Sequence, residues 1–290
     1  YPHYSAEDQF TAWAVVGGMP FYLRSFQDSQ SIFANIRQHI LDAQTGTLFN
    51  EPRLLLMEEL REPRNYFSIL RAIAQGRTRL NEITQAAGVG DVNTAARYLD
   101  ILQQMRLVTR RVPATEPQPE KSKKGLYQIE DHFLRFWFRY VHPNQSSLDL
   151  GLADAVLTQR VQPDLDHFAA AAFEEAAVTL TGRLAQAGQL DFLPERIGGW
   201  WHRKAEMDVL AVNLTEKTAL VGECKWSIHP VGTRVLDELK QKAQIFQQEH
   251  GIEKLQYALF ARRGFTPELE EAAKAEGVRL FTVESLINPE

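Results

Sequence analysis

The sequence has a single cysteine, Cys224, among its 290 residues. One thiol excludes an internal disulfide, and it excludes a zinc site built from cysteines. No apolar run approaches the length of a membrane span, and no signal peptide is recognisable at the start of the chain. We therefore expect a cytoplasmic protein that has no membrane partner.

A second absence concerns nucleotide hydrolysis. The sequence contains no G-x-x-x-x-G-K-[ST] loop, so we expect no site for ATP hydrolysis within this chain. The chain begins with Tyr1 instead of methionine, from which we expect a piece of a longer protein. Its length is sufficient for about two domains, or for about three small ones.

Charge is unevenly distributed along the sequence. The net charge is −5, yet residues 61–125 hold twelve Lys and Arg against six Asp and Glu, which gives this segment a net charge of +6. Hydrophobic residues make up 44% and charged residues 24% of the chain, as in an ordinary globular protein. The basic segment is therefore the candidate face for nucleic acid.

Two apolar runs near the end of the chain carry the residues with the clearest chemistry. The runs 200–212 and 219–226 each read as one strand, and the short polar gap between them predicts a hairpin. Asp208 lies in the first run, and Glu223 and Lys225 lie in the second. Since side chains alternate along a strand, Glu223 and Lys225 share a face, and the hairpin brings Asp208 close to Glu223.

Two fixed carboxylates form an oxygen site for Mg²⁺, which prefers hard ligands and retains several waters. A bound Mg²⁺ polarises a phosphoryl oxygen and acidifies a water molecule. Lys225 is placed to orient that water or to stabilise charge on the phosphate. The three side chains therefore predict a magnesium-dependent site in which Asp208 and Glu223 are the metal ligands.

The alternative is that these charges have no common role, because Glu-x-Lys occurs by chance in most proteins of this size. Context favours a site: Asp208 and Glu223 lie within apolar runs, where a charge is costly without a partner or a metal. Cys224 is expected to face the other side of its strand and to serve in packing. Lys240 and Lys242 follow on the next predicted helix, where we expect a solvated face; the alternative is a contact with phosphate.

The N-terminal part of the chain reads as helical. Residues 1–60 predict a helical subdomain without chemistry of its own, because apolar residues such as Ile32, Ile36 and Ile40 recur on one helical face. Residues 61–130 show three helical patterns followed by two strands, which predicts a winged helix-turn-helix. Its third helix spans residues 92–106 and begins after a capping aspartate.

The loop of residues 113–124 is the wing of this predicted module. Basic side chains on the third helix, beside the wing and within it are candidates for contacts with DNA phosphates. They are Arg97, Arg110, Arg111, Lys121, Lys123 and Lys124. The third helix offers few groups that read base edges, so we expect little sequence specificity. The alternative is that the module serves as a spacer or as a protein-interaction surface.

Residues 131–164 form a connector that is dense in aromatic side chains, above all in the run 136–140. Such a run can stack on bases, but at helical spacing it is more often core, which is what we expect here. Residues 165–290 follow the order helix, strands, helix, strand, helix, strand. This order predicts a small α/β domain with a mixed sheet, so that the whole chain has an α+β fold.

The acid on one strand and the Glu-x-Lys on the next resemble the signature of the PD-(D/E)xK nuclease superfamily. The resemblance implies metal-dependent phosphodiester cleavage, in which Asp208 and Glu223 hold the metal and Lys225 is the catalytic lysine. Enzymes of this superfamily commonly add a glutamate from the helix before the first core strand. The matching position here is Glu174, and the adjacent Glu175 is the alternative. The implied fold of this domain is that of a restriction endonuclease.

The order of the segments is similar to that in a family of archaeal-type AAA ATPases that also occurs in bacteria. In that family a P-loop domain precedes a helical lid, a winged helix and a C-terminal domain of unknown function that looks like a restriction endonuclease. The segments that carry the similarity are 17–23, 66–112, 125–131, 136–140, 206–208 and 223–226. The similarity implies that a parent protein binds ATP and that this chain has an ATPase domain or partner. It is also compatible with an oligomer.

Two functions are consistent with these residues. The first is the C-terminal portion of an ATPase that acts on DNA, with a magnesium-dependent nuclease domain and a winged-helix DNA-binding module. The alternative is a regulatory module of an ATPase that binds DNA or protein without catalysis. The residues leave open whether the nuclease site is active, which DNA it acts on, and in what oligomeric state and pathway.

Overall fold

The computed structural model divides into two compact units, which we describe separately. The described residues are 1–60, 63–202 and 205–287. The first unit comprises Tyr1–Arg111 and Gly125–Leu165, and the second comprises Val112–Lys124 and Asp166–Glu290. Helices at the N-terminal end followed by a five-stranded mixed sheet confirm the predicted α+β class. Within the described ranges, no helix is both long enough and apolar enough to cross a membrane.

The first unit opens with helices, as the apolar spacing predicts. These are α1 (Ala6–Val16), α2 (Pro20–Ser25), α3 (Ile32–Asn35), the π-helix η1 (Ile36–Leu41) and α4 (Glu51–Glu59). Ser5 caps α1, because its hydroxyl accepts a hydrogen bond from the Asp8 amide. Ile36 and Ile40, predicted on one face, are both fully buried. This face of the helical segment therefore lies in the interior of the first unit.

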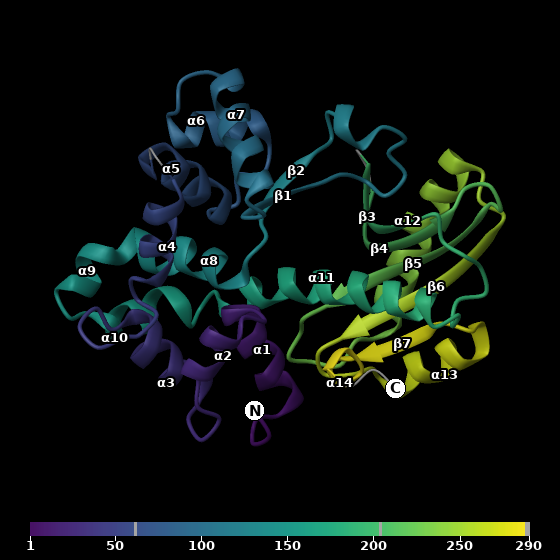
Figure 1. The fold of residues 1–290 in the computed structure, drawn as a ribbon. Helices are drawn as coiled ribbons and strands as arrows, with labels where there is room; N and C mark the ends of the chain where they lie inside the picture. The colour runs from purple at the N-terminus through teal and green to yellow at the C-terminus, as the bar shows by residue number, and fades with distance from the viewer. Residues whose placement is uncertain (61–62, 203–204, 288–290) are drawn as a thin grey trace. The chain divides into compact units, whose positions relative to one another are not determined.

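Three helices and an antiparallel strand pair follow, which is the predicted order of a winged helix (Figure 1). They are α5 (Pro63–Ala74), α6 (Leu80–Ala87), α7 (Val92–Gln104), β1 (Val108–Arg111) and β2 (Leu126–Ile129). Asp91 caps α7 by accepting a hydrogen bond from the Thr94 amide at 2.8 Å. Residues 61 and 62, where the predicted module begins, lie outside the described residues.

The connector consists of short helical segments whose aromatic side chains are core. The segments are α8 (His132–Phe136), η3 (Trp137–Val141), η4 (His142–Asn144), α9 (Gln145–Asp149), α10 (Ala153–Val156) and η5 (Leu157–Val161). Phe136 and Phe138 are fully buried, and the Trp137 indole donates a hydrogen bond to the Phe49 carbonyl at 2.7 Å. The prediction of core packing for this aromatic run is therefore confirmed.

The second unit is built on a sheet with the strand order β3-β4-β5-β6-β7. Its elements are the 3₁₀ helix η2 (Pro119–Lys121), α11 (Leu165–Gln186), β3 (Arg196–His202), β4 (Ala205–Asn213), β5 (Thr218–Lys225), α12 (Thr233–His250), β6 (Lys254–Ala261), α13 (Pro267–Glu276), β7 (Arg279–Thr282) and α14 (Val283–Ile287). Strands β3, β4 and β5 pair antiparallel, whereas β5, β6 and β7 pair parallel. Helices α12 and α13 form the crossovers that parallel strands require.

One prediction about these strands is wrong. The sequence reading treats residues 200–212 as a single strand, but residues 196–202 form β3, and β4 starts at Ala205 and runs antiparallel to it. Residues 203 and 204, between the two strands, lie outside the described residues. The run contains no Gly, Pro or Asn that would signal a reversal, so its apolar pattern reads as continuous.

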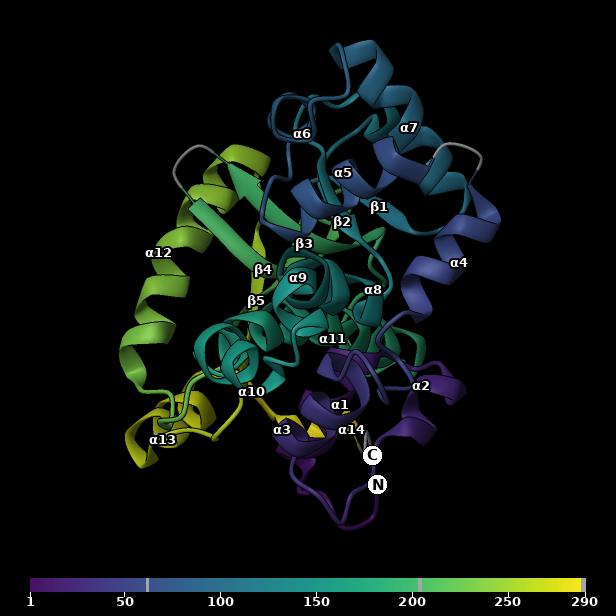
Figure 2. The ribbon, with the colours of Figure 1, turned by 90° about the vertical axis from the view of Figure 1, so that its left-hand side faces the viewer.

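The two faces of the sheet pack against different helices. Figure 2 shows α12 running alongside β4 and β5, and its buried residues Leu236 and Phe246 join the core formed with the sheet. On β5, Val221 belongs to this core. The side chains that alternate with Val221 face α11 instead: the Trp226 ring, just beyond β5, lies 5.2 Å from the Phe173 ring of α11.

A glycine is required where three strands approach closely. A Cβ atom at Gly222 would lie 3.1 Å from Val209 Cβ, 3.1 Å from the Phe260 ring and 3.3 Å from the Ala258 carbonyl oxygen. Two of these contacts come from buried, packed side chains on both neighbouring strands, and the third is backbone. Gly222 therefore sets the spacing of β4, β5 and β6 immediately before Glu223.

We expect the Gly222→Ala substitution to lower the free energy of unfolding by about 1–3 kcal/mol, because the added methyl overpacks the core. Gly198→Ala is the matched control, since its Cβ would meet only Ala114 Cβ at the ordinary distance of 3.6 Å. Urea denaturation of both variants measures the difference. Equal stability of the two variants would contradict this account of strand spacing.

Candidate active site

Asp208 and Glu223 meet because β4 and β5 are neighbours in the sheet. The register pairs Val209 with Gly222, so Asp208 and Glu223 flank this pair on adjacent strands. Asp208 Oδ2 accepts a hydrogen bond from the Cys224 amide at 2.8 Å, which fixes the carboxylate against β5. The predicted proximity of the two acids is therefore present in the structure.

An irregularity in β4 contributes to this arrangement. The register pairs Gly198 with Leu210 and Trp200 with Met207, so β4 has one more residue than β3 between the two pairs. Such a bulge re-aims side chains and occurs frequently beside functional sites. Met207 and Leu210 both pack into the core against α12, as expected when the alternation is interrupted between them. Asp208 lies within this bulge.

Glu223 is a buried carboxylate that is compensated by two ammonium groups. Its side chain is only 8% exposed. Lys225 Nζ donates to Oε1 at 2.9 Å, and Lys242 Nζ lies 2.8 Å from each of the two carboxylate oxygens. A buried carboxylate without such partners would be strongly destabilising. The two lysines therefore compensate the Glu223 carboxylate, which is buried between β5 and α12.

The pKa of Asp208 is raised to about 6, first by burial and then by the negative charge of Glu223. The Cys224 amide and the charges of Lys225 and Lys242 oppose this shift without cancelling it. Asp208 thus loses its proton close to neutral pH. A divalent cation between the two carboxylates would favour the ionised form of both.

Lys225 acts as a cation at this site. Burial alone would lower the pKa of its ammonium group, but the hydrogen bond to Glu223 and the charges of Glu223 and Asp208 outweigh burial, so its pKa lies above the ordinary value. A protonated lysine can stabilise negative charge on a phosphate, and it cannot accept a proton. The arrangement therefore suits charge stabilisation by Lys225.

Cys224 is an inert packing residue. Its thiol is buried, which confirms the predicted packing role. Burial raises its pKa, and the carboxylates of Asp208, Glu174 and Glu223 raise it further. A thiol with a raised pKa is a poor nucleophile and a poor metal ligand. The predicted absence of thiol chemistry is consistent with this environment.

Glu174 lies on α11, which packs on the face of β5 opposite to Glu223. Phe173 beside it contacts Trp226, and the charge of Glu174 acts on Cys224, whose side chain alternates with that of Glu223. Among the described residues, no group of three or more His, Cys, Asp or Glu is arranged to hold a metal ion. The described metal-ligating candidates are thus the pair Asp208 and Glu223.

Lys242 is a site residue that the sequence pattern did not place beside Glu223. It was expected on a solvated face, but it lies on the side of α12 that faces the sheet and contacts Glu223. The signal was its spacing: Lys242 lies three residues after the buried Leu239 and four before the buried Phe246. Lys240, by contrast, forms an ion pair with Glu276.

The predicted DNA-contacting residues fall into two groups. Arg97 on α7 and Lys121 and Lys123 in the loop are exposed. Three others have partners within the protein, and these are Arg110 over the Tyr127 ring at 6.0 Å, Arg111 with Gln128 Oε1 at 3.3 Å, and Lys124 with Glu116 at 3.4 Å. The exposed group is better placed for phosphate contacts than the partnered group.

The loop between β1 and β2 packs within the second unit. The Ala114 amide donates to the Gly199 carbonyl at 2.9 Å, and the Arg196 guanidinium donates to the Glu116 carbonyl. Ala114 itself belongs to the core of the five-stranded sheet. These contacts anchor the loop to β3, and the exposed Lys121 and Lys123 belong to this anchored loop.

The fold and the site together define an α+β protein in which two acids and two lysines cluster on two adjacent strands of a mixed sheet and on the helix that packs against them. Residues 137–241 match the DUF234 family, which is described as archaeal and bacterial proteins of unknown function. The matched range includes Asp208, Glu223 and Lys225, and it ends immediately before Lys242. The expected similarity to an archaeal and bacterial family is confirmed in this form.

A relative extends the similarity beyond that range. An uncharacterized protein of Methanocaldococcus jannaschii is 32% identical over 226 residues, which make up 78% of this chain and 49% of that protein. The chain therefore spans about half the length of this curated relative. No solved structure gives a significant match.

The raised pKa of Asp208 predicts a specific dependence of stability on pH. Since the folded-state pKa of about 6 exceeds the ordinary value of 3.8, the folded protein holds this proton to higher pH than the unfolded chain. The stabilisation is present below about pH 4 and is lost as pH rises through 6. The total change is about 3 kcal/mol, because each pKa unit corresponds to about 1.4 kcal/mol.

We therefore expect the wild-type protein to lose stability relative to Asp208→Asn between pH 4 and pH 7, in the absence of divalent metal. The asparagine carries no ionisable proton, and its amide oxygen can still accept the hydrogen bond from Cys224. Unfolding by urea at several pH values measures both proteins. Stability curves that run parallel over this range would show that Asp208 has an ordinary pKa.

Proposed function

We propose that the second unit is a Mg²⁺-dependent phosphodiesterase domain that acts on DNA. The observation that carries the proposal is the pairing of Asp208 and Glu223 on adjacent strands, with Lys225 hydrogen-bonded to Glu223 at 2.9 Å. Two carboxylate ligands, with the remaining positions filled by water and substrate phosphate, suit Mg²⁺. The order of strands and helices supports the resemblance to PD-(D/E)xK nucleases.

The residues have separate roles in this proposal. Asp208 and Glu223 would hold the metal, which when bound polarises the phosphate and lowers the pKa of a water. Lys225 remains protonated and stabilises the charge that develops on the phosphate. Lys242 must release at least one oxygen of Glu223 before a metal can bind there, and its ammonium group is then available to the phosphate. Glu174 remains a prediction as a further catalytic carboxylate.

A specific observation favours a second function, in which the domain is a binding module without catalysis. Both oxygens of Glu223 are already paired with Lys242, and the described residues offer two metal-ligating carboxylates rather than three. In this case the winged helix and its exposed basic residues would bind DNA or a protein partner. This function predicts binding to DNA that weakens with salt and is not followed by cleavage.

The larger setting also belongs to the proposal. The similarity in segment order to archaeal-type AAA ATPases supports an ATPase domain or partner for this chain, with the site of ATP hydrolysis in that domain or partner. The length of the Methanocaldococcus jannaschii relative leaves room for such a domain. A cytoplasmic location and an oligomeric assembly also stay predictions.

We expect metal-dependent cleavage of DNA that falls about a hundredfold or more in Lys225→Ala, because one charge-stabilising group in a transition state contributes on this scale. Single-stranded, duplex and branched DNA are incubated with Mg²⁺ or Mn²⁺, and products are resolved on denaturing gels. Lys240→Ala is the matched control, since this lysine pairs with Glu276 and not with Glu223.

Cleavage that survives in both Lys225→Ala and Asp208→Ala would indicate a contaminating nuclease and contradict the proposal. Binding of DNA without cleavage by the wild-type protein would favour the binding module. Circular dichroism and thermal unfolding of each variant establish that a loss of cleavage is not a loss of fold.

A further inference from the structure

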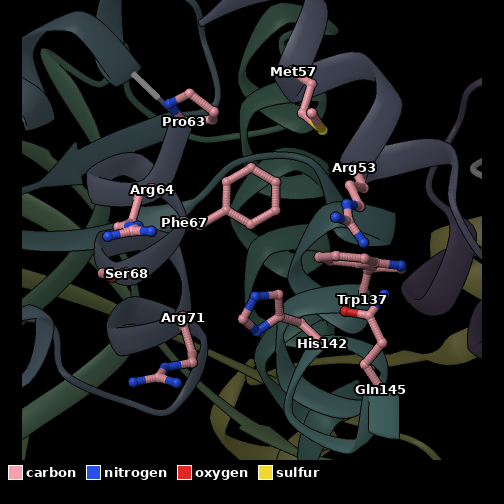
Figure 3. Close-up of a pocket in the computed structure, with 10 residues that line it drawn as sticks. All are labelled: Arg53, Met57, Pro63, Arg64, Phe67, Ser68, Arg71, Trp137, His142 and Gln145. Carbon is pink, nitrogen blue, oxygen red and sulfur yellow. The ribbon is translucent and has the colours of Figure 1, made fainter. Parts of the chain in front are cut away.

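The first unit contains a pocket of about 380 Å³ that none of the proposed nuclease residues reaches (Figure 3). It is lined by Arg53, Met57, Pro63, Arg64, Phe67, Ser68, Arg71, Trp137, His142 and Gln145. Its size falls within the usual range for small-molecule sites, which is about 300–1,000 Å³. The lining residues that the structure describes include three arginines and a histidine, and no carboxylate.

The spacing of residues on α5 builds one wall of this pocket. Arg64, Phe67, Ser68 and Arg71 are related by steps of three and four residues, so they share one face of the helix. Figure 3 shows Phe67 between these two arginines on one side and Arg53, from α4, on the other. The guanidinium groups are thus placed around an aromatic ring.

The floor of the pocket is aromatic. The Phe67 ring lies 6.3 Å from the buried Trp137 ring and 5.8 Å from the His142 ring, and Trp137 and His142 are 5.4 Å apart. His142 Nδ1 is buried and has no hydrogen-bond partner among the described residues. A half-buried Phe67 on a rigid floor is a suitable surface for a planar ring.

The described residues of the unit do not balance the positive charge of the pocket. Arg53, Arg64 and Arg71 are exposed and form no ion pair with a carboxylate among the described residues. Burial lowers the pKa of His142, and the nearby charges of Arg71 and Arg53 lower it further. An anion in the pocket would relieve this repulsion, and guanidinium groups bind phosphate oxygens in pairs.

We propose that this pocket binds a nucleotide, with its phosphate held by Arg53, Arg64 and Arg71 and its base stacked on Phe67. The combination of guanidinium groups around an aromatic ring selects a ligand that is both anionic and planar. The volume accommodates one nucleotide unit and excludes a helix or a folded peptide. The nucleotide is either a free mononucleotide or one residue of a DNA strand, since both present the same phosphate and base.

The test is equilibrium binding by calorimetry with the full chain, using AMP, adenosine, inorganic phosphate and a short oligodeoxyadenylate as probes. We expect AMP or the oligonucleotide to bind more tightly than adenosine or phosphate, because only they supply both contacts. Arg71→Ala should weaken this binding about tenfold or more, as expected for a hydrogen-bonded charge contact. Phe67→Leu, which keeps an apolar side chain without a ring, should also weaken it.

Arg77→Ala is the matched control, since Arg77 is an exposed arginine that follows α5 and does not line the pocket. If Phe67→Leu does not fold, Arg64→Ala is measured in its place and should also weaken binding. Binding of AMP that weakens in the pocket variants identifies a free nucleotide as the ligand. Binding of the oligonucleotide alone that weakens in the same variants identifies a DNA strand. Equal losses in Arg71→Ala and Arg77→Ala, full affinity in Phe67→Leu, or no binding of either probe would overturn the proposal.

Discussion

The second unit depends on the way in which a negative charge is accommodated at Glu223. The carboxylate is only 8% exposed, and it is neutralised from two directions, by Lys225 on its own strand and by Lys242 on the helix that covers the sheet. An unpaired buried charge costs several kcal/mol, so these ion pairs are what makes a buried carboxylate tolerable at this position. This three-residue ion cluster ties α12 to β5 and keeps an acid at the position where Asp208 approaches.

The ion cluster of Glu223, Lys225 and Lys242 is compatible with both proposed functions, the binding module and the nuclease. With both lysines on Glu223, the unit is a stable scaffold whose acid is fully compensated. In the proposed nuclease, a divalent cation held by Asp208 and Glu223 would take over part of this compensation and would leave the lysines available to a phosphate. Burial and, after it, the nearby charge of Glu223 raise the pKa of Asp208, so this acid is held at an electrostatic cost, which is a common property of functional sites.

Local patterns in the sequence predicted much of this architecture. The predicted order of helices and strands in residues 165–290 is confirmed, because compact apolar runs such as β6 and the proline at the first turn of α13 are strong signals. The pairing of Asp208 with Glu223 followed from the predicted closeness of two strands. The boundary between β3 and β4 was missed, since no turn residue marks it.

Features that depend on tertiary contacts could not be derived from local patterns. The bulge at Asp208 is visible only when the registers of β3 and β4 are compared. The inward position of Lys242 depends on which face of α12 meets the sheet, and a lysine is ordinarily assigned to solvent. Likewise, the basic residues of loop 113–124 predicted a wing that contacts DNA, whereas the local pattern gave no sign that Ala114 lies in the core of the second unit.

The central claim is that Asp208 and Glu223 form a divalent-cation site, and calorimetric titration of the apo protein with Mn²⁺ tests it most directly. The account predicts one site per chain whose affinity falls about tenfold or more in Glu223→Gln, because one of two charged ligands is lost. Glu253→Gln, an exposed acid paired with Lys217, should bind as the wild type does. Equal Mn²⁺ affinity in the wild type and Glu223→Gln would contradict the account.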